Sequence, residues 1–256
     1  MPTTKPAKLA FWDASWDLRA HECPCDIEFV EWLDQNRITD KTIYHFGTGA
    51  HHYVGIECAR ESRRNAVLGI TASPQEYESF VDMAIAKPEV LRWYNAMFGD
   101  IYLINERLLP SFDVVTLFHL CEFRTEQTDG YGGLTDLEVT NLLTEKTAPG
   151  GYILFFPKSY AFDWEGPMSG KRVIAQWEKE QPVTRVGEYK TLLVYRKVGS
   201  PGSASTRRSS CTAKWADRRT GGAAQADRAL SRKPSRSRLT SRGASCCTQC
   251  PAPSTR

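Results

Sequence analysis

Short apolar runs alternate with amphipathic stretches from residue 41 to residue 198, an order typical of an α/β sheet. The run 112–118, Phe-Asp-Val-Val-Thr-Leu-Phe, is almost continuously apolar, as expected of a central parallel strand that helices cover on both faces. The predicted strands are 41–46, 67–71, 101–105, 112–118 and 152–156, with a terminal hairpin of 183–186 and 191–196. The predicted helices are 27–35, 54–63, a helix from Pro74 to just before Pro88, a short one over 88–98, 134–146 and a last one around 172–179.

Two of these helices start with a capping signal. Ser73-Pro74-Gln75-Glu76 has the spacing of a capping box, with proline at the first helical position. Asp26 is predicted to cap the first helix, whose Glu28 should then face water. Residues before that helix show no sustained period, so residues 1–40 are interpreted as an N-terminal arm and helix that pack on the core.

A glycine loop follows the first predicted strand in residues 42–52, Thr-Ile-Tyr-His-Phe-Gly-Thr-Gly-Ala-His-His. Gly47 and Gly49 allow a sharp turn and close approach of a ligand, because neither carries a Cβ. Strand, glycine loop and helix follow one another in the order of a nucleotide site, although Gly-x-Gly alone is equally typical of a plain turn. An enzymatic interpretation therefore requires that the backbone at 47–49 forms a bare, concave floor.

Composition and charge divide the chain in two. With 256 residues and 41% hydrophobic content, the sequence suits one ordinary domain with an appendage. It has neither a run of about 18 apolar residues nor a secretory signal pattern, so we expect a cytoplasmic protein. The formal net charge is +3, yet residues 199–256 hold ten Arg and two Lys against two Asp. The body, 1–198, is consequently acidic.

The basic segment 199–256 has few large apolar side chains, so we predict a disordered Ser/Arg-rich tail after a domain that covers 41–198. Clustered arginine could tether nucleic acid or an acidic membrane. The alternatives are a solvated appendage or an out-of-frame extension. Because the body is acidic, nucleic acid is not the expected partner.

The cysteines do not predict a metal site. Cys246, Cys247 and Cys250 could bind zinc, but no second Cys or His pair lies nearby at zinc-finger spacing. His21, Cys23 and Cys25 alternate along the chain and could chelate a soft metal, although such a pattern is more often incidental. We therefore expect no metal.

Four features together resemble the class I S-adenosylmethionine-dependent methyltransferases. They are the Gly-Thr-Gly loop, the Phe-Asp-Val-Val start of the fourth strand, the Ala-Pro-Gly-Gly turn before the fifth, and the closing hairpin. The resemblance covers most of 41–198. It implies a Rossmann-like three-layer sandwich, a mostly parallel seven-stranded sheet with an antiparallel C-terminal hairpin, and S-adenosyl-L-methionine as cofactor.

The resemblance also implies which residues hold that cofactor. Three positions depart from the family: His45 and the pair Ala72-Ser73 stand where acidic residues are usual, and His51 replaces the third glycine of the loop. Charge-assisted acceptors for the ammonium and ribose groups are missing there. The cofactor-binding residues implied are His45, Phe46, Gly47, Thr48, Gly49, Ala50, Ser73, Asn105 and Glu106.

In this family the first and fourth strands are neighbours, so His51 and His52 should lie beside His119 and Glu122. A histidine can serve as a base near neutral pH, and His119 is the predicted catalytic base for methyl transfer to a hydroxyl. The alternatives are a structural hydrogen bond at the strand end and a metal site of His51, His52 and His119.

Aromatic side chains in the loops 125–133 and 159–166 suggest a pocket for a small ring-bearing or sugar-like acceptor, or simply a packed lid. The predicted substrate-binding residues are His52, Glu122, Tyr131, Tyr160 and Trp164. The predicted function is methyl transfer from S-adenosylmethionine to a small molecule. The alternative is an inactive methyltransferase-like binding domain.

Overall fold

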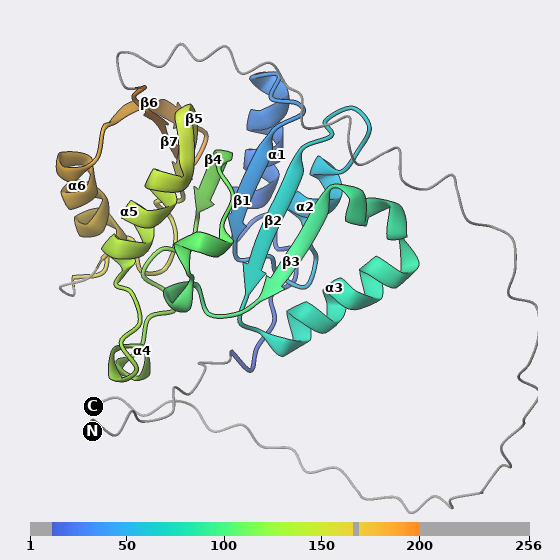
Figure 1. The fold of residues 1–256 in the computed structure, drawn as a ribbon, viewed down its shortest axis with the longest axis horizontal. Coiled ribbons are helices and arrows are strands. Elements are labelled where there is room, and N and C mark those ends of the chain that lie inside the picture. Colours follow the sequence, from blue (N-terminus) through green and yellow to red (C-terminus); the bar gives the residue numbers. More distant parts are fainter. Residues whose placement is uncertain (1–11, 166–168, 200–256) are drawn as a thin grey trace, which may run out of the picture. The chain divides into compact units, whose positions relative to one another are not determined.

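The computed structural model describes residues 12–165 and 169–199, so the predicted tail beyond Gly199 lies outside the described residues. Seven strands form one sheet in the order β3-β2-β1-β4-β5-β7-β6 (Figure 1). The strands are β1 (Thr42–Phe46), β2 (Ala66–Thr71), β3 (Tyr94–Phe98), β4 (Phe112–Leu117), β5 (Thr147–Phe155), β6 (Val183–Tyr189) and β7 (Leu192–Lys197). β1 to β5 pair in parallel, and β7 pairs antiparallel with both β5 and β6. The predicted Rossmann-like α/β fold is confirmed.

Helices flank the sheet. They are α1 (Cys25–Gln35), α2 (Tyr53–Cys58), α3 (Pro74–Ala86), α4 (Glu126–Gly130), α5 (Asp136–Lys146) and α6 (Gly170–Glu180). Three short 3₁₀ helices are η1 (Pro88–Arg92), η2 (Ile101–Leu103) and η3 (Glu106–Leu108). None of the helices in the described part of the chain is long and apolar enough to cross a membrane.

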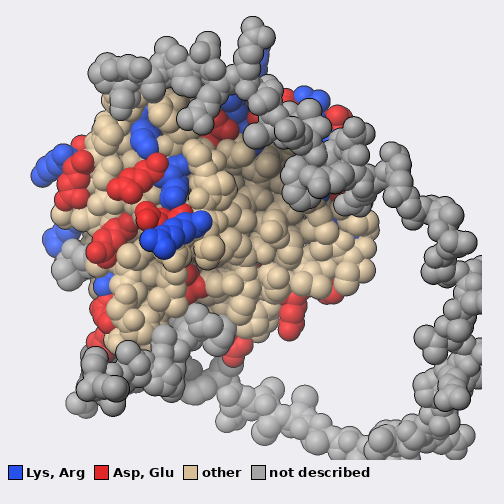
Figure 2. Space-filling view, in the orientation of Figure 1, with Lys and Arg blue, Asp and Glu red and all other residues tan. Residues whose placement is uncertain are grey.

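Two hydrophobic cores lie on opposite faces of the sheet because neighbouring residues of a strand point to opposite sides. On β1, Ile43 belongs to the core with α1, α2 and α3, whereas Tyr44 belongs to the core with α5 and α6. Val114 and Val115 of β4 divide in the same way. Figure 1 shows these two helix groups on either side of the strands. In Figure 2, charged side chains of both signs gather on the left, on the side of α5 and α6.

The helix starts differ in part from the prediction. Ser73 does accept from the Glu76 backbone N–H at 3.4 Å, but the Glu76 carboxylate accepts from Thr71 and Trp16, so only half of the capping box forms. The predicted cap at Asp26 is wrong: Pro24 is the N-cap of α1, and Asp26 is a buried residue of its first turn. Glu28, which was expected to face water, is also buried, and its carboxylate accepts a hydrogen bond from the Thr191 N–H.

The third strand is the main correction. The predicted helix 88–98 ends at Arg92 and is followed by β3, while the predicted strand 101–105 starts as η2. In β3 the buried Tyr94 and Ala96 flank an exposed Asn95, the alternation of a strand. A Cβ at Gly55 or Gly69 would meet the Tyr94 ring, so these glycines make room for it. The third strand consequently ends at Phe98.

Two further boundaries move. α2 ends at Cys58 instead of Arg63. β5 begins at Thr147, so the predicted turn 149–151 lies inside the strand, where the pairing with β4 shifts register. Gly150 has φ +79, and a Cβ on Gly151 would lie 2.6 Å from the Asp113 carbonyl oxygen. The two glycines therefore permit an irregularity at this point of the strand, where the sequence predicted a stop.

Candidate functional site

A cavity of about 230 Å³ lies at the carboxyl ends of β1, β2, β3 and β4. The end of β1 contributes Phe46, Gly47 and Gly49, and the segment after β4 contributes His119 and Glu122. Ligands of open α/β sheets bind at this edge, where the strand order reverses on either side of the first strand. β1 and β4 are neighbours in the sheet, as predicted, which brings the glycine loop and His119 together.

The backbone of the glycine loop lines the cavity, as the enzymatic interpretation requires, but two side chains stand close beside it. Gly47 and Gly49 have φ values of +85 and +56, so both use the left-handed region that favours glycine. A Cβ on Gly47 would lie 3.0 Å from His119 Cδ2, and one on Gly49 would meet the His51 ring and lie 2.9 Å from the Trp16 carbonyl oxygen. Two imidazoles therefore occupy space beside the loop.

Residues 12–23 cross over the ends of β1 and β2 and form one side of the cavity. Backbone bonds hold them there: Trp12 N donates to the Ala72 carbonyl at 3.2 Å, and Ala50 N donates to the Trp16 carbonyl at 2.9 Å. The Ser73 hydroxyl donates to the Ala14 carbonyl at 2.6 Å. The segment is thus an ordered wall of the site.

Phe123 is the centre of an aromatic wall. Its ring lies 4.9 Å from Trp12, 5.6 Å from Phe46 and 6.0 Å from Trp16 between centroids, each in an edge-to-face arrangement. All four residues line the cavity. This wall can hold a flat or apolar part of a ligand.

The side chains of Cys25, Cys23, His119 and Glu122 form one polar cluster beside the cavity. The two sulfur atoms lie 3.3 Å apart, and His119 Nδ1 lies 3.1 Å from Glu122 Oε2. Burial lowers the pKa of His119, but its hydrogen bonds with Cys23 and Glu122 outweigh burial and raise that pKa to about 10. The hydrogen bond with Cys25, and then His119, lower the pKa of the Cys23 thiol. Cys23 and His119 therefore favour a thiolate–imidazolium pair.

Three buried carboxylates also line the cavity: Asp26, Glu76 and Asp100. Glu76 accepts from Thr71 at 2.6 Å, and Asp100 accepts from the Tyr102 N–H at 2.8 Å and from the Tyr131 hydroxyl. Asp26 has weaker partners, with Cys25 Sγ at 3.8 Å from one oxygen. Burial raises the pKa of Asp26 to about 7, and burial also raises the pKa of Glu76.

His45 and His52 are buried behind the cavity and do not line it. His45 Nδ1 pairs with Thr116 Oγ1 at 2.8 Å, while His52 pairs with the Tyr94 hydroxyl at 2.8 Å and the Glu76 carbonyl at 3.0 Å. Burial lowers the pKa of His45 to about 3 and that of His52 to about 4. Both are neutral structural groups, and the predicted substrate role of His52 has no support from its position.

The structure brings six of the predicted site residues to the cavity and leaves the others elsewhere. Those that line it are Phe46, Gly47, Gly49, Ser73, His119 and Glu122; those that do not are His45, Thr48, Ala50, His52, Asn105, Glu106, Tyr131, Tyr160 and Trp164. The sequence predicts Asn105 and Glu106 at the end of the third strand, but β3 ends at Phe98, so Gly99 and Asp100 line the cavity in their place.

Comparison with known proteins supports the fold. No family model and no curated protein matches the sequence. Among solved structures, the chain is similar to the CcbJ methyltransferase from Streptomyces caelestis, at 12% identity over 72% of this chain and 94% of that chain, with a TM-score of 0.50. It is also similar to the [4+2]-cyclase SpnF, at 11% identity over 75% of this chain and 88% of that chain, with a TM-score of 0.50. A third is the N-methyltransferase NodS from Bradyrhizobium japonicum WM9 in complex with S-adenosyl-L-homocysteine, at 16% identity over 70% and 90%, with a TM-score of 0.47. Of the two structures with a TM-score of 0.50, one is thus named a methyltransferase and the other is named for another reaction.

Proposed function

We propose that the cavity binds S-adenosylmethionine and that the protein transfers a methyl group to a small-molecule acceptor. The observation that carries the proposal is the cavity itself, which lies over Gly47 and Gly49 at the carboxyl ends of the parallel strands. S-Adenosylmethionine, when bound, supplies an electrophilic methyl group on a positively charged sulfur.

The charge of the lining fits a cationic ligand. Among the described residues that line the cavity, six carboxylates stand against a single arginine, Arg19, which is itself paired with Glu22 at 3.1 Å. Asp26 is the best candidate to meet a positive group, because a cation would stabilise its buried anionic form. Asp26, Glu76 and Asp100 would thus supply the acidic groups that the sequence motif lacks. Asp26 comes from α1 and Glu76 from α3, whereas Asp100 follows β3, where the resemblance also expects cofactor contacts.

The size of the cavity sets a condition. Drug-sized ligands usually occupy sites of about 300–1,000 Å³, so a cavity of about 230 Å³ is small for this cofactor. Room for it would come from rotation of the Trp16 and Leu18 side chains, which line the cavity and are exposed, while hydrogen bonds hold the backbone of residues 12–23. Binding should therefore change the fluorescence of Trp16.

The catalytic role of His119 stays a prediction, and the groups around this histidine restrict how it could act as a base. With a pKa of about 10 the imidazole is protonated at neutral pH and cannot accept another proton. His119 could act as a base only after passing its proton to Cys23. Wild-type turnover in both His119→Ala and His119→Gln would contradict any catalytic role. Methyl transfer itself needs chiefly an aligned acceptor, which the aromatic wall and Glu122 can position.

Calorimetric titration of the full chain with S-adenosylhomocysteine tests the proposal. We expect micromolar binding, weakened by Gly47→Ala, whose Cβ would press on His119. Gly132→Ala is the matched control, because Gly132 also has a positive φ of +76 but has nothing within 4 Å of its Cβ position. Absence of binding at millimolar ligand would overturn the proposal and leave the cofactor-free binding domain.

A further inference from the structure

We propose that Cys23, Cys25 and His119 form a binding site for a soft divalent metal ion, for which zinc is the best match. The inference goes beyond methyl transfer and does not depend on it. The three residues each offer one ligand atom, and these atoms all lie within 4.8 Å of one another. Thiolate and imidazole are the ligands that zinc prefers in proteins.

The spacing of the atoms suits a single ion. Zinc bonds of about 2.3 Å to sulfur and about 2.0 Å to nitrogen place two sulfur ligands of a tetrahedron about 3.8 Å apart. The sulfur atoms of Cys23 and Cys25 lie 3.3 Å apart, so they need to separate by only about half an ångström. A site with this geometry is close to preformed.

The local backbone explains why both thiols lie together. Cys25 is the first residue of α1 and Pro24 is its N-cap, with a ring that fixes the backbone between the two cysteines. The Cys23 N–H donates to the Arg19 carbonyl at 2.8 Å, which closes a turn before the helix.

The third ligand is held by a carboxylate, as in many metal sites. His119 Nδ1 pairs with Glu122 at 3.1 Å, which leaves Nε2 as the ring nitrogen that can bind an ion together with Cys23. The other oxygen of Glu122 accepts from the Tyr160 N–H at 3.0 Å, so the backbone orients the carboxylate in turn. A carboxylate that fixes the ligating histidine in this way raises its basicity toward the ion.

The surroundings leave a position for a fourth ligand. All three residues line the cavity, so water or a substrate could complete the coordination from that side. Three protein ligands with one open position are typical of catalytic zinc sites, whereas structural sites are closed by four. His21, by contrast, has a largely exposed side chain next to Glu22 and does not join the cluster.

The test uses the full chain with Cys211, Cys246, Cys247 and Cys250 replaced by serine, so that tail thiols cannot bind metal. The reduced, chelator-treated protein is titrated with Co²⁺, which reports thiolate ligands by a sulfur-to-cobalt charge-transfer band and tetrahedral geometry by strong visible bands. We expect one ion per chain, displaced by Zn²⁺. Cys25→Ser and His119→Gln should each weaken binding at least tenfold, and Glu122→Gln about tenfold.

Two controls keep the result specific. Cys121→Ser and His21→Gln should bind cobalt as the parent does, because neither residue belongs to the cluster. X-ray absorption of the zinc-loaded parent should show two sulfur ligands, independently of whether any variant folds. Lack of a charge-transfer band in large excess of Co²⁺, unchanged binding in both Cys25→Ser and His119→Gln, or a shell of nitrogen and oxygen alone would overturn the proposal.

Discussion

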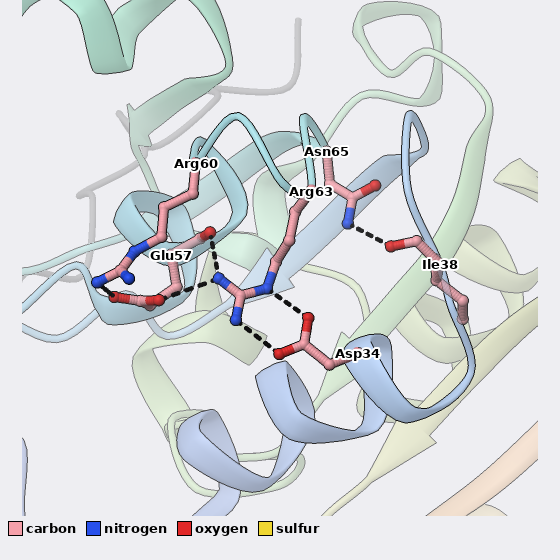
Figure 3. Close-up of polar contacts among 6 residues, drawn as sticks. All are labelled: Asp34, Ile38, Glu57, Arg60, Arg63 and Asn65. Carbon is pink, nitrogen blue, oxygen red and sulfur yellow. Dashed lines mark hydrogen bonds and ion pairs between the residues drawn. The ribbon is translucent and has the colours of Figure 1, made fainter.

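The two ends of the parallel strands carry polar clusters of opposite kinds. At the amino ends, Arg63 donates to both oxygens of Asp34 at 2.7 Å and to the carbonyl and carboxylate of Glu57 at 2.9 and 3.0 Å (Figure 3). Asn65 donates to the Ile38 carbonyl at 2.9 Å beside it. In this cluster each charged side chain has a partner of opposite charge, and each of the three nitrogen atoms of the Arg63 guanidinium donates a hydrogen bond.

The cluster at the carboxyl ends consists of Asp26, His45 and His51, and we call it unbalanced because His45 Nε2 has no hydrogen-bond partner among the described residues and Asp26 has only a weak one. Asp26 lies 3.6 Å from His45 Nε2 and 3.7 Å from His51 Nε2, beyond hydrogen-bond distance. The pKa of Asp26 is raised, that of His45 is lowered and that of His119 is raised. Saturated pairs stabilise a fold, whereas buried groups with shifted pKa values and a cavity between them mark a place for a ligand.

The largest loss of stability is expected from Gly49→Ala in the loop of the unbalanced cluster. Its φ of +56 is unfavourable for alanine, and the new Cβ would meet His51 and the Trp16 carbonyl. We expect a loss of about 3 kcal/mol in the free energy of unfolding, measured with urea. Gly132→Ala, with the same backbone strain in open space, should lose only about 1 kcal/mol. Equal losses would show that no close packing surrounds the loop.

Asp26→Asn should stabilise the protein in a pH-dependent way. The folded state holds the Asp26 proton more tightly than the unfolded state, so wild-type stability falls as pH rises from about 4 to about 7. The variant lacks this loss and should gain about 4 kcal/mol at pH 8, because the pKa of Asp26 lies about three above its usual value, and less than about 1 kcal/mol at pH 4. The check is urea unfolding at both pH values, with the exposed Asp82→Asn as control. A gain that is independent of pH would contradict the assigned pKa.

Arg63→Ala should cost about 2 kcal/mol in unfolding free energy, because it leaves Glu57 without its buried partner. Arg60, also paired with Glu57 but with a side chain that is 63% exposed, should cost less than about 0.5 kcal/mol when changed to alanine. Neither change should affect the affinity for S-adenosylhomocysteine. Weaker binding of S-adenosylhomocysteine by a folded Arg63→Ala variant would show that the cluster at the amino ends also contributes to the ligand site.

The smallest effect is expected from the aromatic wall. Trp16→Ala removes one ring that packs on Phe123 and should weaken binding of S-adenosylhomocysteine about threefold to tenfold in calorimetry. Trp164→Ala is the comparison, because Trp164 is 59% exposed and does not line the cavity. A larger loss of affinity in Trp164→Ala than in Trp16→Ala would show that the ligand binds beside the loop 159–166 and not in the cavity.

The sequence predicts the parts of the fold whose patterns are strong and local. β1, β2 and β4 are dense apolar runs, and Ser73 and Pro74 mark the start of α3. The predicted bounds of these elements therefore lie within a residue or two of the observed ones. β3 was missed because its Tyr94-Asn95-Ala96 alternation is short and follows a helix start at Pro88. The strand depends on packing of Tyr94 over two glycines from other elements, which no local pattern contains.

The sequence predicts only those residues of the candidate site that come directly after a strand. Gly47, Gly49 and His119 come directly after β1 and β4, and the resemblance to methyltransferases placed them together. Cys23 and Asp26 meet them through the docking of the N-terminal segment, which has no period in the sequence. A proline between two cysteines just before a helix was the available signal for that part of the cavity.

A crystal structure of the full chain soaked or grown with S-adenosylhomocysteine would decide whether this cavity is the cofactor site. We expect the nucleoside to lie against the backbone of 47–49, between Trp16 and Asp26, while the Arg63 cluster is unchanged. A ligand bound anywhere else, or none at saturating concentration, would contradict this expectation.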